Sequence, residues 1–204
     1  MLITTMLLST TAHAESRTWE LDPSASTLFV LVKHDPNTAL AGMAHDHTIA
    51  ATGWSGTVSW DPDVPGACEV HIDVPVSGLV VDPPGYRARA GLEGDVSDGD
   101  KVKIAENMWG NRQLEKDRFP AISFASKSCE GSGTSFVVVG DMTIHGVTKQ
   151  VSTRMTIEAD DAGFHASGTL PAGLTTWDMS PFTAAMGMIK NLNDLAFTID
   201  VKGH

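Results

Sequence analysis

Apolar and polar residues alternate along much of the chain, which is typical of β-strands that bury one face. The clearest example is the stretch 136–157, whose first half places four apolar residues on one face: Phe136, Val138, Met142 and Ile144. A short polar turn with one glycine follows at 145–149, and the alternation resumes at Val151. The stretch therefore predicts a β-hairpin with one buried face.

The same period of two recurs in other parts of the chain, each time bounded by residues that favour turns. We predict eight strands, which lie near 19–34, 48–60, 68–79, 122–129, 136–144, 151–157, 164–170 and 195–201. Eight antiparallel strands with short connections fit a closed barrel, because closure removes exposed edges and can enclose one ligand. The predicted fold class is all-β, an eight-stranded antiparallel up-and-down β-barrel.

One segment shows helical spacing instead. Residues 100–115 contain apolar positions about one helical turn apart, Met108 and Trp109 among them. Ser97 precedes Asp100 by three residues, a spacing that favours a helix N-terminus there. We expect one short helix near 100–115 that covers the barrel as a lid or plug.

Length and charge narrow the classes of function. The 204 residues suit a single all-β domain. The formal net charge is −11, from 25 acidic and 14 basic residues, so we expect no nucleic-acid partner, which would need a positive surface. The sequence has no Gly-x-Ser-x-Gly elbow, no P-loop and no Gly-x-Gly-x-x-Gly after a strand. We therefore predict a binding protein and not an enzyme.

The first fourteen residues carry no charge and end in Ala12-His13-Ala14, the small-x-small pattern of a signal-peptidase site. We predict a signal peptide at 1–14, followed by one domain at 15–204. An ordinary N-terminal strand or tail is the alternative. No other apolar run approaches the roughly 18 residues that a membrane span requires.

Export would bring the two cysteines into an oxidising compartment. Cys68 opens one predicted strand and Cys129 closes the next. If these strands pair antiparallel, the start of one lies opposite the end of the other, so we predict a disulfide between Cys68 and Cys129. Two separate buried thiols remain the alternative.

Three motifs lie along the predicted strands. They are Asp22-Pro23-x-x-Ser26 running to Val32-Lys33-His34, Phe119-Pro120-x-Ile122-x-Phe124-x-Ser126, and Val139-Gly140-Asp141-Met142-Thr143-Ile144-His145-Gly146-Val147-Thr148-Lys149. Over most of residues 19–201 their order and spacing resemble the YceI-like, polyisoprenoid-binding family, and the third motif is the most specific. The chain departs from the family pattern at Ala25, where members often have His, and in a longer segment between His34 and Ile49.

The resemblance implies a periplasmic, lipocalin-like barrel whose long cavity takes an isoprenoid or another long amphiphilic chain. It also implies a carrier or stress-linked binding protein with no established reaction. We therefore expect an isoprenoid lipid or a quinone as the bound ligand, and transient contact with a membrane. A monomer and a homodimer both stay open.

Aromatic and methionine residues are the candidates for contact with such a chain, because methionine adapts its rotamers to what it touches. The candidates are Trp54, Trp60, Met108, Trp109, Met142, Met155, Trp177 and Phe182. A filled core without a cavity, as in a small interaction module, is the alternative, because such residues usually pack against one another.

His45-x-His47 is the sharpest chemical signal, because two imidazoles one residue apart on a strand point to the same side. They could grip one zinc or copper ion, with His34 as a third ligand. The alternatives are a pair of exposed histidines, or side chains that bind the polar head of a ligand at the mouth of the cavity. The sequence does not determine which way His45 and His47 face.

Overall fold

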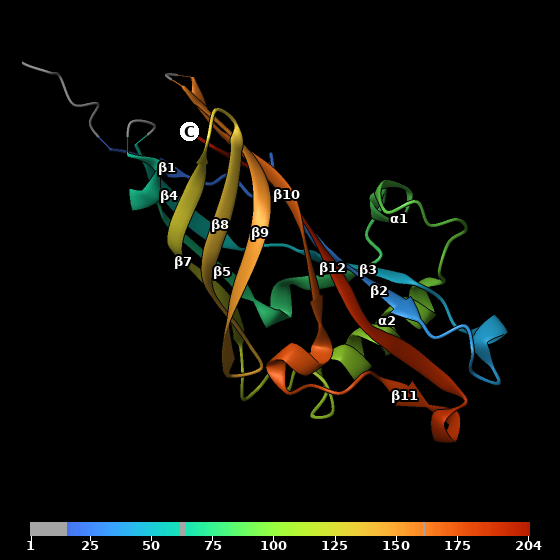
Figure 1. Cartoon of the computed structure of the whole chain (residues 1–204). Coiled ribbons are helices and arrows are strands. Elements are labelled where there is room, and N and C mark those ends of the chain that lie inside the picture. Colours follow the sequence, from blue (N-terminus) through green and yellow to red (C-terminus); the bar gives the residue numbers. More distant parts are fainter. Residues whose placement is uncertain (1–15, 62–63, 161) are drawn as a thin grey trace, which may run out of the picture.

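Antiparallel β-strands account for most of the chain in the computed structural model, as the alternation predicted. The structure describes residues 16–61, 64–160 and 162–204, so the predicted signal peptide at 1–14 lies outside the described residues. Figure 1 shows the strands curling around a shared interior. The β7–β8 turn and the C-terminus lie at one end of the molecule, and α2 and β11 lie at the other.

Twelve strands occur in the described residues. They are β1 (Arg17–Glu20), β2 (Thr27–His34), β3 (His47–Ala51), β4 (Ser55–Trp60), β5 (Glu69–Pro75), β6 (Leu79–Val81), β7 (Ala121–Ser132), β8 (Ser135–Ile144), β9 (Val147–Asp160), β10 (Gly163–Gly173), β11 (Thr183–Ala184) and β12 (Ile189–Gly203). Their order in the sheet is β1-β4-β5-β7-β8-β9-β10-β12-β2-β3-β6, and β11 pairs with β12 outside this path.

The helical segments are short. The α-helices are α1 (Tyr86–Arg89) and α2 (Asp98–Trp109), and the 3-10 turns are η1 (Ala41–Met43), η2 (Pro65–Ala67), η3 (Val76–Gly78), η4 (Leu174–Trp177) and η5 (Ala185–Gly187). Within the described part of the chain, no helix is both long and apolar enough to cross a bilayer.

The eight predicted strands and the twelve observed ones describe the same lengths of chain. Three predicted strands are interrupted, giving the pairs β1/β2, β3/β4 and β5/β6, and the two-residue β11 is an addition. Gly53 interrupts the second pair with a φ of 62°, a left-handed conformation that glycine adopts without steric cost. Pro75, which cannot donate to a β-ladder, ends β5 before η3.

The interruptions let the two halves of each long strand pair with different neighbours. One half of each interrupted strand lies in the run β1-β4-β5-β7, and the other half lies in the run β12-β2-β3-β6. A bridge between Leu21 and Gly203 joins β1 back to β12, so the sheet closes on itself there; we call this the ring end. At the opposite end β6 has separated from β7, and α2 packs against β6; we call this the helix end.

Aromatic side chains fill the ring end. The rings of Trp60 and Phe136 meet edge to face with centroids 5.2 Å apart, and those of Trp19 and Phe164 lie 5.6 Å apart. All four residues are buried. Offset and edge-to-face aromatic pairs add to the energy of burial, so this cluster stabilises the closure of the sheet.

The helix α2 spans Asp98–Trp109, so it begins two residues before the predicted segment and ends six residues earlier. The Ser97 hydroxyl accepts a hydrogen bond from the backbone N–H of Asp100 (3.2 Å) and donates one to its carboxylate (2.7 Å). This side-chain cap satisfies one of the orphan N–H groups at the helix start. Gly110 then turns to an extended conformation, which ends the helix.

The hairpin of β8 and β9 is confirmed, but its turn is tighter than predicted. His145 and Gly146 alone connect the strands, with φ values of 52° and 73°, as a type I′ hairpin turn requires. A side chain at Gly146 would collide with the ring of Phe119. The His145 ring also contacts Phe119, with centroids 4.5 Å apart, so this histidine belongs to the turn.

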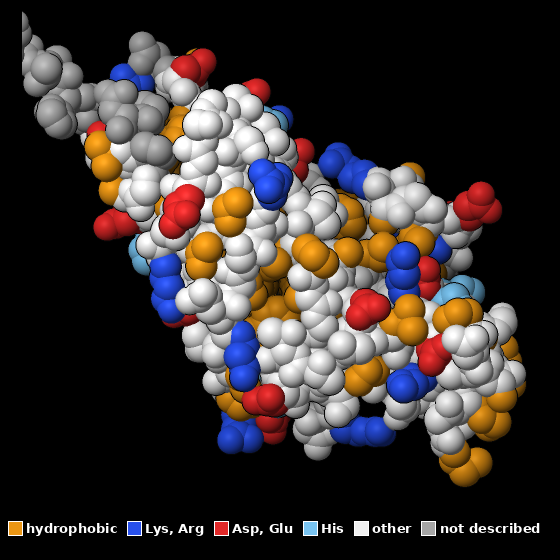
Figure 2. All heavy atoms as spheres, viewed as in Figure 1, with side chains coloured by type: hydrophobic (Ala, Val, Ile, Leu, Met, Phe, Trp, Pro, Cys, Tyr) orange, Lys and Arg blue, Asp and Glu red, His pale blue; other side chains and the backbone are white. Residues whose placement is uncertain are grey.

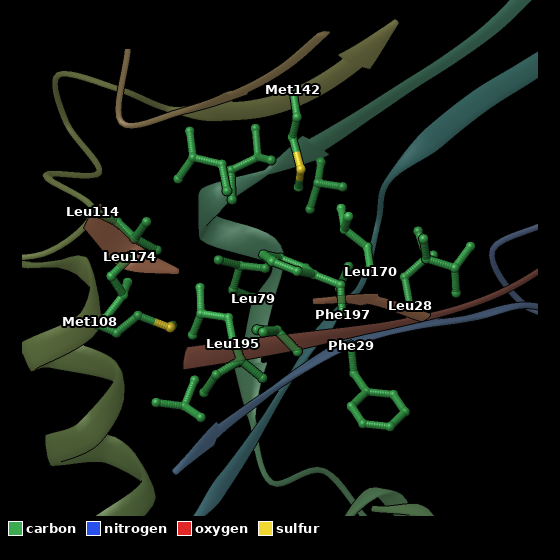
Figure 3. Close-up of a pocket in the computed structure, with 18 of the residues that line it drawn as sticks. Leu28, Phe29, Leu79, Met108, Leu114, Met142, Leu170, Leu174, Leu195 and Phe197 are labelled. Carbon is green, nitrogen blue, oxygen red and sulfur yellow. The ribbon is translucent and has the colours of Figure 1, made fainter. Parts of the chain in front are cut away.

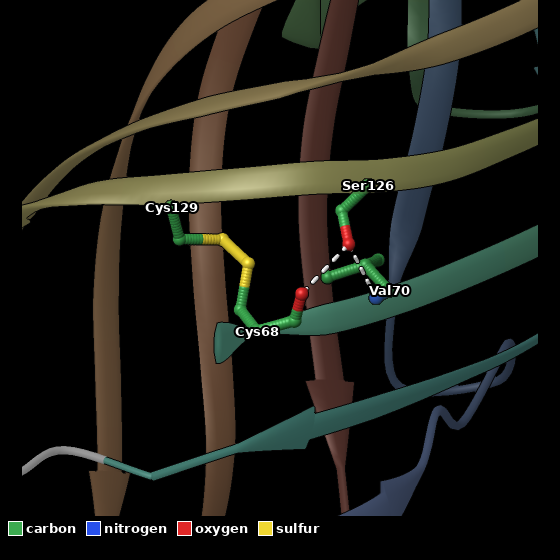
Figure 4. Close-up of a disulfide and its surroundings, with 4 residues drawn as sticks. All are labelled: Cys68, Val70, Ser126 and Cys129. Carbon is green, nitrogen blue, oxygen red and sulfur yellow. Dashed lines mark hydrogen bonds between the residues drawn. A yellow bond between two sulfur atoms is a disulfide. The ribbon is translucent and has the colours of Figure 1, made fainter. Parts of the chain in front are cut away.

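The strands β5 and β7 pair antiparallel, and a disulfide joins Cys68 to Cys129 beside them (Figure 4). The register of β7 against β8 shifts between Ser126 and Ser128. The Ser126 hydroxyl bridges to the other neighbouring strand, accepting from the backbone N–H of Val70 (2.8 Å) and donating to the carbonyl oxygen of Cys68 (3.1 Å). The disulfide and this bridge fix the start of β5 against β7.

Candidate ligand cavity

A cavity of about 700 Å³ occupies the interior of the curled sheet. Its wall comes from α2 and from every strand except β1 and β11, and Figure 3 shows side chains from these elements converging on one space. The labelled residues are Leu28, Phe29, Leu79, Met108, Leu114, Met142, Leu170, Leu174, Leu195 and Phe197. The size falls within the range of about 300–1,000 Å³ that is usual for ligand pockets.

The strand register explains why apolar side chains reach this space. Residues directly opposite each other on paired strands point to the same face of a sheet. Val30 lies opposite Ile49, and Phe197 lies opposite Val30, and all three line the cavity. One inward row therefore continues from strand to strand around the barrel.

Figure 2 shows hydrophobic side chains at the bottom of a hollow in the middle of one face. Figure 1 has the same view, and there the position of the hollow lies beside β9 and β10. The pairing of these two strands runs only as far as Gly168 opposite Met155, although both strands continue beyond it. The strands thus separate where the hollow lies.

One face of α2 lines the helix end of the cavity. Residues with helical spacing form this face: Asp100, Lys103, Ile104, Asn107 and Met108. The first turns of the helix contribute polar groups, and Lys103 pairs with Asp100 at 3.1 Å. The last turn contributes the neutral side chains of Asn107 and Met108, so the charged groups of this wall lie in the first half of the helix.

His45 and His47 face the cavity at this polar end. His47 begins β3 and lies opposite Val32, an inward residue, so the register places its side chain inside. Its Nδ1 lies 2.7 Å from a carboxylate oxygen of Asp82. The ring of His45 lies 6.3 Å from that of His47, between centroids. The structure thus gives both imidazoles an orientation that the sequence left open.

Asp82 is buried, with 2% of its surface exposed, and follows β6 in a left-handed conformation (φ 45°). Its carboxylate accepts hydrogen bonds from the backbone N–H (2.8 Å) and the hydroxyl (3.1 Å) of Thr48, and it lies 3.4 Å from the Arg87 guanidinium. Burial alone would raise the pKa of Asp82, but the hydrogen bonds from His47 and Thr48 outweigh it and lower the pKa below its ordinary value.

Arg87 lies on α1, outside the one helix that the sequence predicted near 100–115. Its guanidinium donates to the backbone carbonyl oxygens of Asp46 (2.7 Å), Glu93 (2.8 Å) and Gly94 (2.8 Å). These bonds hold the segment after β6 against the start of β3. Arg87 therefore acts as a structural centre beside the cavity, a role that no motif in the sequence marks.

Seven of the predicted ligand-binding residues line the cavity. They are His45, His47, Met108, Met142, Met155, Trp177 and Phe182. Trp177 is fully buried, and its indole Nε1 donates to the backbone carbonyl of Met142 at 3.1 Å. The bond fixes the indole ring at the cavity wall.

The other four predicted residues lie outside the cavity lining. Trp60 belongs to the aromatic cluster of the ring end, and the indole of Trp109 donates to the carbonyl oxygen of Val76. Trp54 is buried on the same parity as Val58, and it packs in the core outside the cavity lining. The Nδ1 of His34 lies 2.6 Å from the Asp46 carboxylate.

The described residues contain no group of three histidines, cysteines or acids placed to hold a metal ion. The imidazole of His34 pairs with the carboxylate of Asp46, and the imidazole of His47 pairs with the carboxylate of Asp82. His45 and His47 thus gain no third ligand from the described structure. Their geometry favours the alternative in which they border the cavity.

Several lining residues were not singled out from the sequence. The aliphatic ones, such as Leu170 and Leu195, lie on the predicted inward faces of strands. The polar residues Asp100, Lys103 and Asn107 could have been found from their helical spacing with Met108. No sequence pattern predicted that Asp82 lies beside the cavity, because its position depends on the pairing of β3 with the three-residue β6.

A family model described as a YceI-like domain matches residues 19–201. The UPF0312 protein of Yersinia pestis (strain Pestoides F) is 22% identical over 196 residues, which cover 90% of this chain and 88% of that protein. The UPF0312 protein of Pseudomonas fluorescens (strain SBW25) is 26% identical over 126 residues, or 57% of this chain. The chain spans 56% of the length of the Pseudomonas relatives that it matches.

Two solved structures have the same fold. BcnA of Burkholderia cenocepacia superposes with a TM-score of 0.66 at 15% identity, over 90% of this chain and 99% of that one. The YCEI protein of Campylobacter jejuni superposes with a TM-score of 0.54 at 12% identity, over 76% of this chain and 82% of that one. The match of the family model over residues 19–201 shows that the chain belongs to the YceI-like family.

Proposed function

We propose that the protein binds and carries a long-chain isoprenoid, or a similar amphiphilic lipid, inside the barrel. The observation that carries the proposal is the cavity of about 700 Å³ with its mainly aliphatic wall. Each methylene group removed from water contributes about 0.8 kcal/mol, so a long chain can bind tightly without specific polar contacts. An apolar wall also gains dispersion contacts when a chain fills the space.

Binding, and not a reaction, is the role we propose for this cavity. Aliphatic side chains dominate its wall, and they supply no acid, base or nucleophile. The polar groups gather at the helix end, where Lys103 pairs with Asp100 and His47 with Asp82. An amphiphile would place its head among these groups and its chain toward the ring end.

We propose that the protein works in the periplasm. The signal-like residues 1–14 and the bond between Cys68 and Cys129 support this, because disulfides persist in oxidising compartments. The mass of protein taken from a periplasmic extract tests the proposal, and a chain that begins at Glu15 is the expected result. An uncleaved chain that stays in the cytoplasm would overturn it.

We propose that lipid exchange takes place by brief contact with a membrane at the helix end. Three methionines are exposed near it, Met43 on η1, Met186 on η5 and Met188 after it, and Met186 is 99% exposed. The backbone N–H of Leu40 bonds to the carbonyl oxygen of Met188, which ties the two segments together. Met43 also lines the cavity, so this apolar surface continues into the proposed binding space.

Organic extraction of the purified protein, followed by mass spectrometry, tests the central proposal. We expect a lipid with a long apolar chain to co-purify, and delipidated protein to take up added polyprenols or quinones with quenching of tryptophan fluorescence. If no lipid co-purifies and none is taken up, the proposal is wrong.

A further inference from the structure

A neighbouring carboxylate determines which ring nitrogen of His47 carries the hydrogen of the neutral ring. The carboxylate of Asp82 is buried, accepts hydrogen bonds from Thr48 and lies beside the guanidinium of Arg87. An ionised carboxylate can only accept, so the Nδ1 of His47, 2.7 Å away, must be the donor. The partner of one ring nitrogen thereby fixes the role of the other.

The Nε2 of His47 remains available to a ligand. His47 lines the cavity with 13% of its side chain exposed, and no described residue bonds to this nitrogen. Because Nδ1 carries the hydrogen, Nε2 of the neutral ring offers a lone pair. The guanidinium of Arg87 lies 3.4 Å from the same carboxylate and compensates its charge.

The charged groups of α2 that line the cavity near His45 offer little to an anionic head. Asp100 on α2 lines the same end of the cavity and interacts electrostatically with His45. The ammonium group of Lys103 lies 3.1 Å from Asp100, which already compensates its charge. A phosphate group would have to compete with Asp100 for Lys103, whereas a neutral hydroxyl would not.

We propose that the Nε2 of His47 accepts a hydrogen bond from the hydroxyl head of the bound amphiphile, which makes long-chain isoprenoid alcohols the preferred ligand class. The inference rests on the proposed binding of a chain in the cavity and deepens it by naming the head. Asp82 acts as a positioning residue, because it orients the ring and fixes the tautomer through Nδ1.

A set of ligands with one chain and different heads tests the proposal. Geranylgeraniol, its methyl ether and its monophosphate share the same C20 chain, but only the alcohol is a neutral hydroxyl donor. At pH 8, above the range in which imidazoles ordinarily titrate, we expect the alcohol to bind about three- to tenfold more tightly than the ether, the worth of one hydrogen bond. The phosphate should bind more weakly than the alcohol.

Two variants locate the effect. In His47→Asn the shorter amide can still donate to Asp82 but lacks the atom that faces the cavity, so the preference for the alcohol over the ether should vanish. The matched control is His71→Asn, at an exposed position of β5, which should keep the preference. Equal affinities for alcohol and ether in the unaltered protein, or a preference that survives His47→Asn, would overturn the proposal.

The outcomes also separate this inference from the proposed function. If both the alcohol and the ether bind with equal affinity, the cavity binds chains and only the assignment of His47 is wrong. If neither binds, both proposals are wrong. Tighter binding of the phosphate than of the alcohol likewise overturns the assignment.

A spectroscopic measurement tests the tautomer without any ligand or variant. A long-range ¹H–¹⁵N spectrum of the folded protein at pH 8 distinguishes a protonated Nδ1 from a protonated Nε2. We expect His47 to carry its hydrogen on Nδ1. A hydrogen on Nε2 would remove the acceptor and with it the proposal.

Discussion

The indole Nε1 of Trp109 donates a hydrogen bond of 3.0 Å to the backbone carbonyl oxygen of Val76. Trp109 is the last residue of α2, and Val76 begins the turn η3 between β5 and β6. The bond therefore fastens the helix to the place where the sheet opens. Lys116 lies 4.5 Å above the same indole ring, so the contact is covered from solvent on one side.

Replacing Trp109 with phenylalanine should loosen this end of the barrel. The change removes one of the two donors to the carbonyl oxygen of Val76, which keeps the backbone N–H of Leu79, so we expect a loss of about 0.5–1.5 kcal/mol of the free energy of unfolding. We expect urea denaturation to show this loss, and a bound lipid to dissociate faster. The matched control is Val102→Ala on the exposed side of α2, which should change neither quantity. Unaltered stability and dissociation in Trp109→Phe would contradict this account.

The disulfide should contribute strongly to stability, because Cys68 and Cys129 are 61 residues apart. In the chain-entropy account, closing a loop of that length stabilises the fold by roughly 4 kcal/mol. We expect the double variant Cys68→Ala, Cys129→Ala to lose an amount of this order in chemical denaturation. A reducing agent should produce a similar loss in the unaltered protein and none in the variant. An equal response of the two proteins to reduction would contradict the prediction.

The lowered pKa of Asp82 predicts how stability depends on pH. A carboxyl group whose pKa is lower in the folded state stabilises the fold fully above its unfolded pKa of about 3.9, and this contribution disappears as the pH falls through the folded value. Asp82→Asn should therefore be less stable than the unaltered protein at pH 7, by about 1–3 kcal/mol, because it loses a charged acceptor. The difference should shrink below about pH 4.

Urea denaturation of both proteins between pH 7 and pH 2 measures this difference. Asp22 and Asp100 also have lowered pKa values, from the side-chain hydrogen bonds of Ser24 and Ser97. These groups are the same in both proteins, so their contributions cancel in the difference. A gap between the two proteins that stays constant down to pH 2 would contradict the role assigned to Asp82.

Local pattern was sufficient to predict most of the inward faces. Val138 and Ile144 lie on the same face of β8, and both line the cavity. A period of two fixes the face of every residue in an uninterrupted strand. The alternation correctly predicted the burial of Trp54, but Trp54 lies outside the cavity lining, directly after the left-handed Gly53. A glycine in a sequence does not reveal which conformation it adopts.

The polar end of the cavity could not be assembled from the sequence, because its members meet through distant pairings. Asp82 and His47 are 35 positions apart in the sequence. They meet because β6 pairs with β3. The pair His45 and His47 was visible, but its direction depended on the register of His47 against Val32. Register between strands is set by the whole barrel and not by either strand alone.

The space at the ring end of the cavity should limit the length of the chain that binds. Ala166 lines the cavity there, opposite Ile157 on β9 and Val201 on β12, close to the aromatic cluster. In Ala166→Phe the new ring would occupy the space that the far end of a long chain reaches. Losing the burial of about three methylene-sized groups costs about 2 kcal/mol, or roughly thirtyfold in affinity. We expect a C20 isoprenol to lose affinity by about this factor and a C10 isoprenol to bind as before.

Thr169→Phe is the matched control, because it adds the same ring at an exposed position of the same strand. Affinities of C10, C15 and C20 isoprenols for the two variants, measured by tryptophan fluorescence, show whether the loss grows with chain length. The thermal stability of Ala166→Phe should not fall, since the new side chain enters existing apolar space. An equal loss for all three chains would mean that even the C10 chain reaches Ala166, against the proposed placement of the head. The head would then have to lie elsewhere than beside His47, because the chain runs from the head toward the ring end in our proposal.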